Sequence, residues 1–170
     1  MRTVILNLAV SLDGLIEGPN GEYDWCYTDQ DYGMSAFMER VDTIFFGRKS
    51  YEVLLGTDSN AYPGKKKFVF SRTLTSIKGA ELIRGDLVEG EVGRIKDQPG
   101  RDIWLFGGAE LAGFFLNAGL IDELQLAIHP LLLGRGKPLF SGSQHRIGWN
   151  LVNMRRYSTG LVQLFYRREK

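Results

Sequence analysis

Short apolar runs recur along the first two thirds of the chain, and each stops at a small or polar residue. β-rich runs of this kind cover residues 3–10, 42–47, 67–70 and 102–106, and a weaker one covers 81–83. Apolar runs of this length, bounded by turn residues, indicate buried strands. The first run is expected to form a central strand of one sheet.

Helical signals fill most of the intervals between these strands. Thr28 to Asp31 form a capping-box pattern, which predicts a helix start. That helix would carry on one face Met34, Phe37, Met38 and Val41. A short helix is expected from Gly47 to about Gly56, and a third over residues 87–96.

The last third of the chain changes character. Residues 123–129 alternate between polar and apolar, and two further strands, 151–157 and 161–167, flank a turn at 158–160. Strands alternating with helices, followed by strands alone, predict an α/β fold. Its central sheet would be mostly parallel but mixed, with flanking helices and a C-terminal antiparallel hairpin.

The stretch from Asp102 to Gly119 combines a strand, a glycine pair and a helix. The strand ends at Gly107 and Gly108, and Gly119 lies where a C-terminal helix cap belongs. One helical face would carry Leu111, Phe115 and Ala118. Backbone amides at such a helix start can bind a phosphate, and missing Cβ atoms permit close approach. A tight turn without a ligand is the alternative, because the GxGxxG spacing is absent.

Three strand ends share one pattern. The segments are Phe46-Gly47-Arg48, Phe70-Ser71-Arg72-Thr73 and Phe106-Gly107-Gly108. Ligands of open α/β sheets collect at the carboxyl ends of the strands, and arginine is a good bidentate phosphate partner. Together these ends could hold a dinucleotide, with the 2′-phosphate of NADP on Arg72, Ser71 and Thr73. A surface salt bridge is the alternative for each arginine.

Composition excludes several classes of protein. The 170 residues suggest one domain, 1–170, and the net charge of +1 offers no strong field for nucleic acid or an anionic membrane. No stretch is long enough to span a bilayer, and no signal peptide is recognisable. Cys26 is the lone cysteine, which fits a reducing cytoplasm. His129, His145 and Cys26 make a poor metal-binding set, so no metal is expected.

Four motifs, in order along the chain, resemble one enzyme superfamily. They are Ser11-Leu12-Asp13-Gly14, the segment 47–52 (GRKSYE), the segment 107–111 (GGAEL) and the segment 118–124 (AGLIDEL). The first three motifs look like those of the dihydrofolate reductase superfamily. The fourth motif resembles the C-terminal reductase domain of the bifunctional riboflavin-biosynthesis deaminase/reductase and its stand-alone relatives. The resemblance covers essentially the whole chain.

The resemblance implies a dihydrofolate reductase-like sheet that binds NADPH. The positions implied near the pyrophosphate are Gly47, Arg48, Lys49 and Ser50. Those implied at the adenosine 2′-phosphate are Ser71 and Arg72. The positions implied along the pyrophosphate and nicotinamide are Gly107, Gly108, Ala109, Glu110 and Leu111. The loop covering the nicotinamide would contain Leu15 and Ile16.

Two aspartates are candidates for the catalytic chemistry. Asp31 aligns with the acidic residue that contacts the pterin in dihydrofolate reductases, but it is also the acidic member of the capping box. Asp13 lies in a loop that borders the substrate in riboflavin-type relatives, but an aspartate before Gly14 is also common in turns. Trp25 would form a wall of the substrate pocket or, alternatively, belong to the core.

Two departures weaken the case for a strict dihydrofolate reductase. The supporting threonine expected near residues 126–128 is absent, and Ser35 replaces the usual aromatic residue. We therefore expect an NADPH-dependent reductase of a small heterocycle, a pteridine or pyrimidine related to folate or riboflavin precursors. The alternative is a non-catalytic nucleotide-binding or scaffold protein with the same fold. A homodimer is expected by analogy, through the C-terminal strands.

Overall fold

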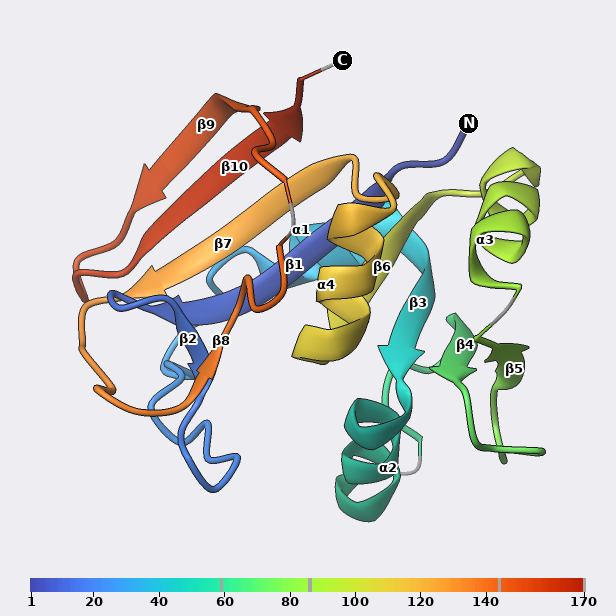
Figure 1. Cartoon of the computed structure of the whole chain (residues 1–170). Coiled ribbons are helices and arrows are strands. Elements are labelled where there is room, and N and C mark those ends of the chain that lie inside the picture. Colours follow the sequence, from blue (N-terminus) through green and yellow to red (C-terminus); the bar gives the residue numbers. More distant parts are fainter. Residues whose placement is uncertain (59, 86, 144, 170) are drawn as a thin grey trace.

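The computed structural model describes residues 1–58, 60–85, 87–143 and 145–169. Eight of its strands form one sheet: β1 (Val4–Ser11), β3 (Val41–Gly47), β4 (Lys66–Ser71), β5 (Glu81–Arg84), β6 (Asp102–Gly107), β7 (Glu123–His129), β9 (Trp149–Arg156) and β10 (Val162–Arg168). Their order across the sheet is β5-β4-β3-β6-β1-β7-β10-β9 (Figure 1). The first strand is therefore central, as its apolar sequence predicts.

Strand directions confirm the predicted fold class. Every pairing from β5 to β7 is parallel, whereas β10 pairs antiparallel with both β7 and β9. The strands β9 and β10 form the predicted hairpin and extend the sheet at one edge. The result is a mostly parallel mixed sheet that ends in antiparallel strands.

The described residues form four helices, which cover the two faces of the sheet: α1 (Met34–Arg40), α2 (Arg48–Thr57), α3 (Val88–Asp97) and α4 (Ala109–Asn117). Helices α3 and α4 pack on one face through Val92, Ile95 and Phe115, among others. Helices α1 and α2 pack on the opposite face, where Phe37 and Tyr51 are buried. Burial on both faces explains why the central strands are almost continuously apolar.

The start of α1 differs from the capping-box prediction. The helix begins at Met34, its N-cap is Gly33 in the left-handed region (φ 78°), and Val41 already belongs to β3. Asp31 does bind the helix start, since its Oδ1 accepts hydrogen bonds from the amide (3.0 Å) and hydroxyl (2.7 Å) of Ser35. Of the predicted apolar face, Phe37 is buried and Met34 is exposed.

The long loop after β1 contains a strand that the sequence pattern does not indicate. Strand β2 (Leu15–Glu17) pairs antiparallel with β8 (Lys137–Pro138), from a segment expected to be a loop. Two and three residues give too short a pattern for periodicity to register. By contrast, Gly119 (φ 71°) ends α4 as predicted, with its amide bonded to the carbonyl of Leu116.

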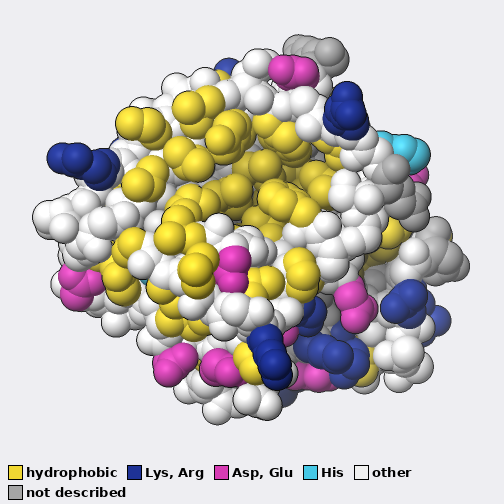
Figure 2. Space-filling view, turned by 60° about the vertical axis from the view of Figure 1, so that its left-hand side comes forward, with side chains coloured by type: hydrophobic (Ala, Val, Ile, Leu, Met, Phe, Trp, Pro, Cys, Tyr) yellow, Lys and Arg dark blue, Asp and Glu magenta, His cyan; other side chains and the backbone are white. Residues whose placement is uncertain are grey.

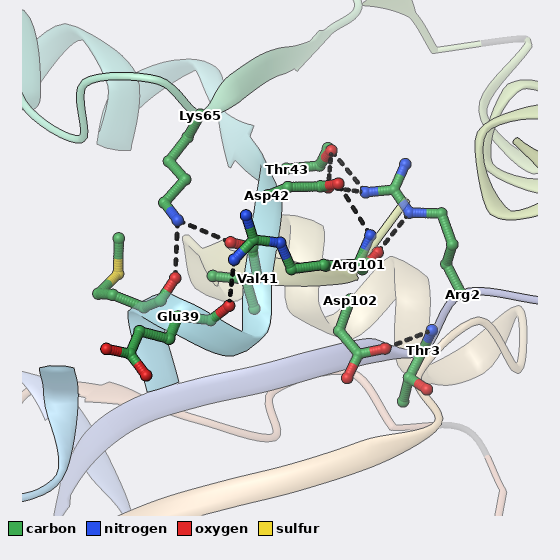
Figure 3. Close-up of polar contacts among 10 residues, drawn as sticks. Arg2, Thr3, Glu39, Val41, Asp42, Thr43, Lys65, Arg101 and Asp102 are labelled. Carbon is green, nitrogen blue, oxygen red and sulfur yellow. Dashed lines mark hydrogen bonds and ion pairs between the residues drawn. The ribbon is translucent and has the colours of Figure 1, made fainter. Parts of the chain in front are cut away.

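Buried charge ties the amino ends of β1, β3 and β6 together (Figure 3). The guanidinium of Arg2, whose side chain is 4% exposed, forms an ion pair with Asp42. It also donates to the Thr43 hydroxyl (2.6 Å) and to the Arg101 carbonyl (2.5 Å). The amide of Arg101 in turn donates to Asp42 at 2.8 Å.

A second group of bonds at this end holds the junction between α1 and β3. The ammonium of Lys65 donates to the carbonyls of Met38 and Val41, both at 2.7 Å, and Arg101 donates to the Glu39 carbonyl at 2.6 Å (Figure 3). These carbonyls end a helix and lack helical partners, so the cations stabilise it.

Candidate functional site

The three strand ends that share a sequence pattern lie side by side. They belong to β4, β3 and β6, which are adjacent in the sheet. A Cβ atom on Gly47 would lie 3.3 Å from the Gly107 carbonyl oxygen and 3.7 Å from Leu111 Cβ. Gly107 has φ 111°, a conformation that favours glycine. These glycines allow the ends of β3 and β6 to approach each other closely.

Two helices begin at this point with amides available. Gly47 is the N-cap of α2 and Gly108 is the N-cap of α4, and neither helix start has a side-chain cap. The Gly108 amide donates to Ser50 Oγ at 3.0 Å. Neighbouring helix starts with uncapped amides and positive dipole ends can bind an anion with several charged oxygens.

The basic residues at these strand ends form weak ion pairs. Arg48 binds Glu52 one turn along α2 at 2.9 Å. Arg72 lies 3.8 Å from Glu110, with both side chains about four-fifths exposed. Exposed pairs of this kind contribute little to stability, so both guanidinium groups remain available to a ligand. Lys49 is exposed.

The end of β4 forms a tight turn in which the Ser71 hydroxyl is already hydrogen-bonded. Ser71 is buried, and its hydroxyl accepts hydrogen bonds from the amides of Thr73 (3.2 Å) and Leu74 (3.1 Å). The turn directs Arg72 and Thr73 to the surface, where both are exposed. The ion pair with Glu110 places the Arg72 guanidinium beside the first turn of α4.

A cavity of about 1040 Å³ lies on the α1 side of the sheet, beside these strand ends. It contains part of the predicted set: Ile16, Asp31, Ser50, Gly107 and Gly108. The predicted residues outside its lining are Asp13, Leu15, Trp25, Gly47, Arg48, Lys49, Ser71, Arg72, Thr73, Ala109, Glu110 and Leu111. The residues at the three strand ends and the cavity lining therefore have Ser50, Gly107 and Gly108 in common.

Asp31 faces the cavity as an ionised carboxylate. Hydrogen bonds from the Ser35 hydroxyl and then the Ser35 amide lower the pKa of Asp31 below its ordinary value of 3.8. An ionised carboxylate at this position can accept a hydrogen bond from a ring N–H. Asp31 can cap α1 and still bind a ligand in the cavity, because the hydrogen bonds to Ser35 use Oδ1 and not Oδ2.

Asp13 instead connects two loops. Its carboxylate accepts hydrogen bonds from the Ser11 hydroxyl (2.5 Å), the Leu133 amide (3.1 Å) and the Gly134 amide (2.7 Å). These bonds, that of Ser11 first, lower the pKa of Asp13. Both oxygens are therefore engaged in joining the turn after β1 to the loop after β7.

His129 fixes the segment that borders the cavity, a contact that sequence reasoning missed. The ring is 2% exposed. Its Nε2 accepts a hydrogen bond from the Tyr27 amide (3.1 Å), and its Nδ1 lies 3.0 Å from the Ala127 carbonyl, so Nδ1 carries the proton. Trp25 and Tyr27 pack edge-on against the ring at 5.2 and 5.0 Å. Trp25 thus contacts a residue of the cavity lining without lining the cavity itself.

Aromatic side chains form one wall of the cavity, which sequence reasoning also missed. Trp104 and Phe106, two residues apart on β6, both face the cavity. Tyr62 packs edge-on against Trp104, with the ring centroids 5.2 Å apart. Tyr62 has φ 57°, which is unusual for a bulky residue and suggests a functional constraint. The sequence signal was the alternation of aromatic side chains in residues 102–106.

No group of three or more His, Cys, Asp or Glu side chains within residues 1–58, 60–85, 87–143 and 145–169 could hold a metal ion. In the same ranges, no helix is long and apolar enough to cross a membrane.

Sheet order, helix placement and the glycine-lined strand ends define a dihydrofolate reductase-like fold. Residues 2–163 match the RibD C-terminal domain, and the chain belongs to that family. It is 46% identical over 178 residues to the uncharacterised protein YyaP of Bacillus subtilis, covering 97% of this chain and 94% of that protein.

Solved structures agree on the fold. The chain superposes on the "Putative riboflavin biosynthesis protein" of Shewanella sp. PV-4 with a TM-score of 0.87 and 30% identity, over 99% of this chain and all of the other. It also resembles dihydrofolate reductase from Enterococcus faecalis, solved with NADP(H), with a TM-score of 0.72 and 16% identity, over 99% and 97% of the two chains. At that identity the second likeness concerns the fold.

Proposed function

We propose that this protein is an NADPH-dependent reductase that transfers hydride to a small heterocycle, a pteridine or pyrimidine related to folate or riboflavin precursors. The observation that carries the proposal is the meeting of two uncapped helix starts, at Gly47 and Gly108, with a cavity of ligand size. Membership of the RibD C-terminal domain family and the NADP(H) of the Enterococcus reductase support it.

The residues at the strand ends fit a nicotinamide dinucleotide. A Cβ on Gly47 or Gly108 would lie 3.3 Å from the nearest polar atom, so larger residues would crowd the place where a pyrophosphate approaches. Amides of Ala109 and Glu110, with Arg48 and Lys49, would bind its oxygens. The exposed Arg72, with Thr73 beside it, would bind the 2′-phosphate. When bound, the cofactor supplies the hydride.

The remaining steps belong to the cavity residues. Asp31 would accept a hydrogen bond from a ring N–H and stabilise the positive charge that develops when the ring is protonated. Ile16, on β2, would cover the nicotinamide and exclude water. Asp13 would hold the loop that carries β2 in place and affect turnover through that loop.

The test is steady-state oxidation of NADPH with a panel of oxidised pteridines and pyrimidines. For the substrate that is reduced, we expect Asp31→Asn to lower kcat about 100-fold or more, which is typical for loss of a proton-handling group, while leaving NADPH affinity unchanged. The amide of asparagine still caps α1, so the variant folds. Turnover of the full panel by Asp31→Asn at the wild-type rate would contradict this role.

We also propose a homodimer formed through the C-terminal strands. Leu151 and Met154 are more than half exposed, and they lie in register with Tyr166 and Leu164 on the α4 side of the hairpin. Figure 2 shows hydrophobic side chains gathered in a hollow on this side of the molecule. Light scattering should give twice the chain mass, and Met154→Asp should give the chain mass.

A further inference from the structure

The floor of the cavity consists of side chains from four strands in two cross-strand rows. Strand registers place Asn7, Gln125, Phe165 and Asn153 in one row across β1, β7, β10 and β9. The next row, one step toward the carboxyl ends of β1 and β7, is Ala9, Ala127, Gln163 and Arg155. All eight residues line the cavity.

Two primary amides lie next to each other in the first row. Asn7 and Gln125 are paired in register and half-buried. Within the described part of the chain, neither side-chain amide has a hydrogen-bond partner. Each amide offers one acceptor oxygen and two N–H donors. Together they match the adjacent N–H and C=O of a lactam, and an unmatched ligand would leave them unsatisfied.

Arg155 supplies a positive charge at the far end of the same floor. Its guanidinium lies over the Phe165 ring, 5.4 Å from the centroid. Its Nη1 also lies 3.1 Å from the place of a Cβ atom on Gly33, at the start of α1. Contacts on two sides hold the guanidinium at the edge of the cavity. Such a planar, pre-organised group suits a carboxylate or phosphate.

The other cations of the cavity lining are already neutralised. Arg40 and Arg167 both bind Glu123, at 2.8 and 3.2 Å. Among the described residues that line the cavity, Arg155 is the arginine without a carboxylate partner. An incoming anion would therefore meet Arg155 without displacing an existing ion pair.

The spacing of these groups sets the size of the ligand. Strands β7 and β9 are two strands apart, about 10 Å at the usual spacing of neighbouring strands. Arg155 lies one side-chain row beyond Gln125, and its long side chain spans part of that gap. A planar ring system with one short substituent fits this distance.

We propose that Asn7 and Gln125 recognise the lactam edge of a planar heterocycle, and that Arg155 binds an anionic substituent on that heterocycle. The inference rests on the proposed function for the heterocycle and deepens it by naming two recognition elements of the substrate. The shared chemistry of the substituent is a carboxylate or phosphate within about 10 Å of the lactam.

The test compares matched fluorescent ligands in binding titrations without turnover. Pterin-6-carboxylate carries the lactam and an anion, 6-hydroxymethylpterin lacks the anion, and the 4-amino analogue of the carboxylate lacks the lactam. Riboflavin and its 5′-phosphate form a second pair that distinguishes phosphate from carboxylate. NADPH affinity is measured on every variant.

For the wild type we expect pterin-6-carboxylate to bind about tenfold more tightly than the alcohol or the 4-amino analogue. Arg155→Met should abolish the preference for the anion, and Gln125→Met, which keeps the length of the side chain, should abolish the preference for the lactam. The controls are Arg156→Met, on the opposite face of β9, and Asn150→Leu, outside the cavity lining. Both should retain both preferences.

Three outcomes would overturn the proposal: equal binding of all ligands by the wild type, equal losses in Arg155→Met and Arg156→Met, or no binding of either ligand pair. Each differs from failure of the proposed function, which appears as absence of NADPH binding. Ligand discrimination without NADPH binding would support this inference and reject the reductase.

Discussion

The two ends of the sheet differ in how their polar groups are bonded. At the amino ends of β1, β3 and β6, the charges of Arg2, Asp42 and Lys65 are buried or bonded to each other and to backbone carbonyls. At the carboxyl ends, glycines replace side chains and helix starts lack side-chain caps. Satisfied polar groups fix the fold at one end, whereas the other end presents helix amides without side-chain caps.

This contrast predicts that substitutions at the amino end affect stability and those at the carboxyl end affect binding. The largest expected effect is that of Arg2→Met, which leaves Asp42 without its buried cation. We expect the free energy of unfolding in urea to fall by about 3–5 kcal/mol, with NADPH affinity of the folded fraction unchanged. The control is Arg94→Met, an exposed pair with Glu91, for which less than about 1 kcal/mol is expected. Equal losses in the two variants would remove the distinction.

Gly107→Ala tests the carboxyl end. The backbone at φ 111° disfavours alanine, so we expect the free energy of unfolding to fall by about 1–3 kcal/mol. Because the end of β6 would shift, NADPH affinity should fall at least about tenfold. Gly93→Ala, in α3 with open space around the new methyl group, should gain about 0.5–1 kcal/mol and bind normally. Unchanged NADPH affinity in Gly107→Ala would place the cofactor elsewhere.

The burial of His129, beside the cavity, predicts that the free energy of unfolding depends on pH. Burial lowers the pKa of His129 below its ordinary value of 6.5. The unfolded chain therefore binds more protons than the folded protein between these two pKa values, and stability falls as the pH drops below about 6.5. The slope should approach about 1.4 kcal/mol per pH unit at most.

Urea unfolding between pH 7 and 5 measures this slope. The slope should diminish in His129→Gln and persist in His145→Gln, since His145 is exposed. Hydrogen exchange at the Tyr27 amide should accelerate over the same pH range in the wild type. A slope unchanged by His129→Gln would show that other groups cause it.

The smallest effect is expected at Glu110. Its carboxylate lies 3.8 Å from Arg72 and competes with any phosphate there. Glu110→Gln should therefore raise NADPH affinity up to about threefold, because exposed pairs are worth less than about 1 kcal/mol. Calorimetry in low salt measures it. A decrease would mean that Glu110 itself contacts the cofactor.

Much of the fold followed from local pattern. The strands β1, β3, β4 and β6 are apolar runs that end at glycine or serine, and the rule for parallel sheets places three of those ends together without knowledge of strand order. Gly119 and the C-terminal hairpin were equally local signals. The short pair β2–β8 left no periodicity to detect.

The cavity floor could not be predicted in the same way. Asn7, Gln125 and Arg155 come from positions far apart in the chain. The parallel pairing of β1 with β7 aligns Asn7 with Gln125, and the antiparallel addition of β10 and β9 brings Arg155 to the same floor. The hydrogen bond from the Tyr27 amide to His129 depends on the path of a loop, which no sequence pattern specifies. The polar residue Asn7 inside an apolar strand was the one signal available. It marks a side chain that a buried strand would otherwise exclude.

The most direct test of the account is a calorimetric titration of the wild type and Arg72→Ala with NADPH and with NADH. We expect the wild type to bind NADPH at least about tenfold more tightly than NADH, and Arg72→Ala to lose that preference while its NADH affinity stays the same. Absence of binding by either cofactor, or equal loss of both in Arg72→Ala, would contradict a dinucleotide site at the carboxyl ends of β3, β4 and β6.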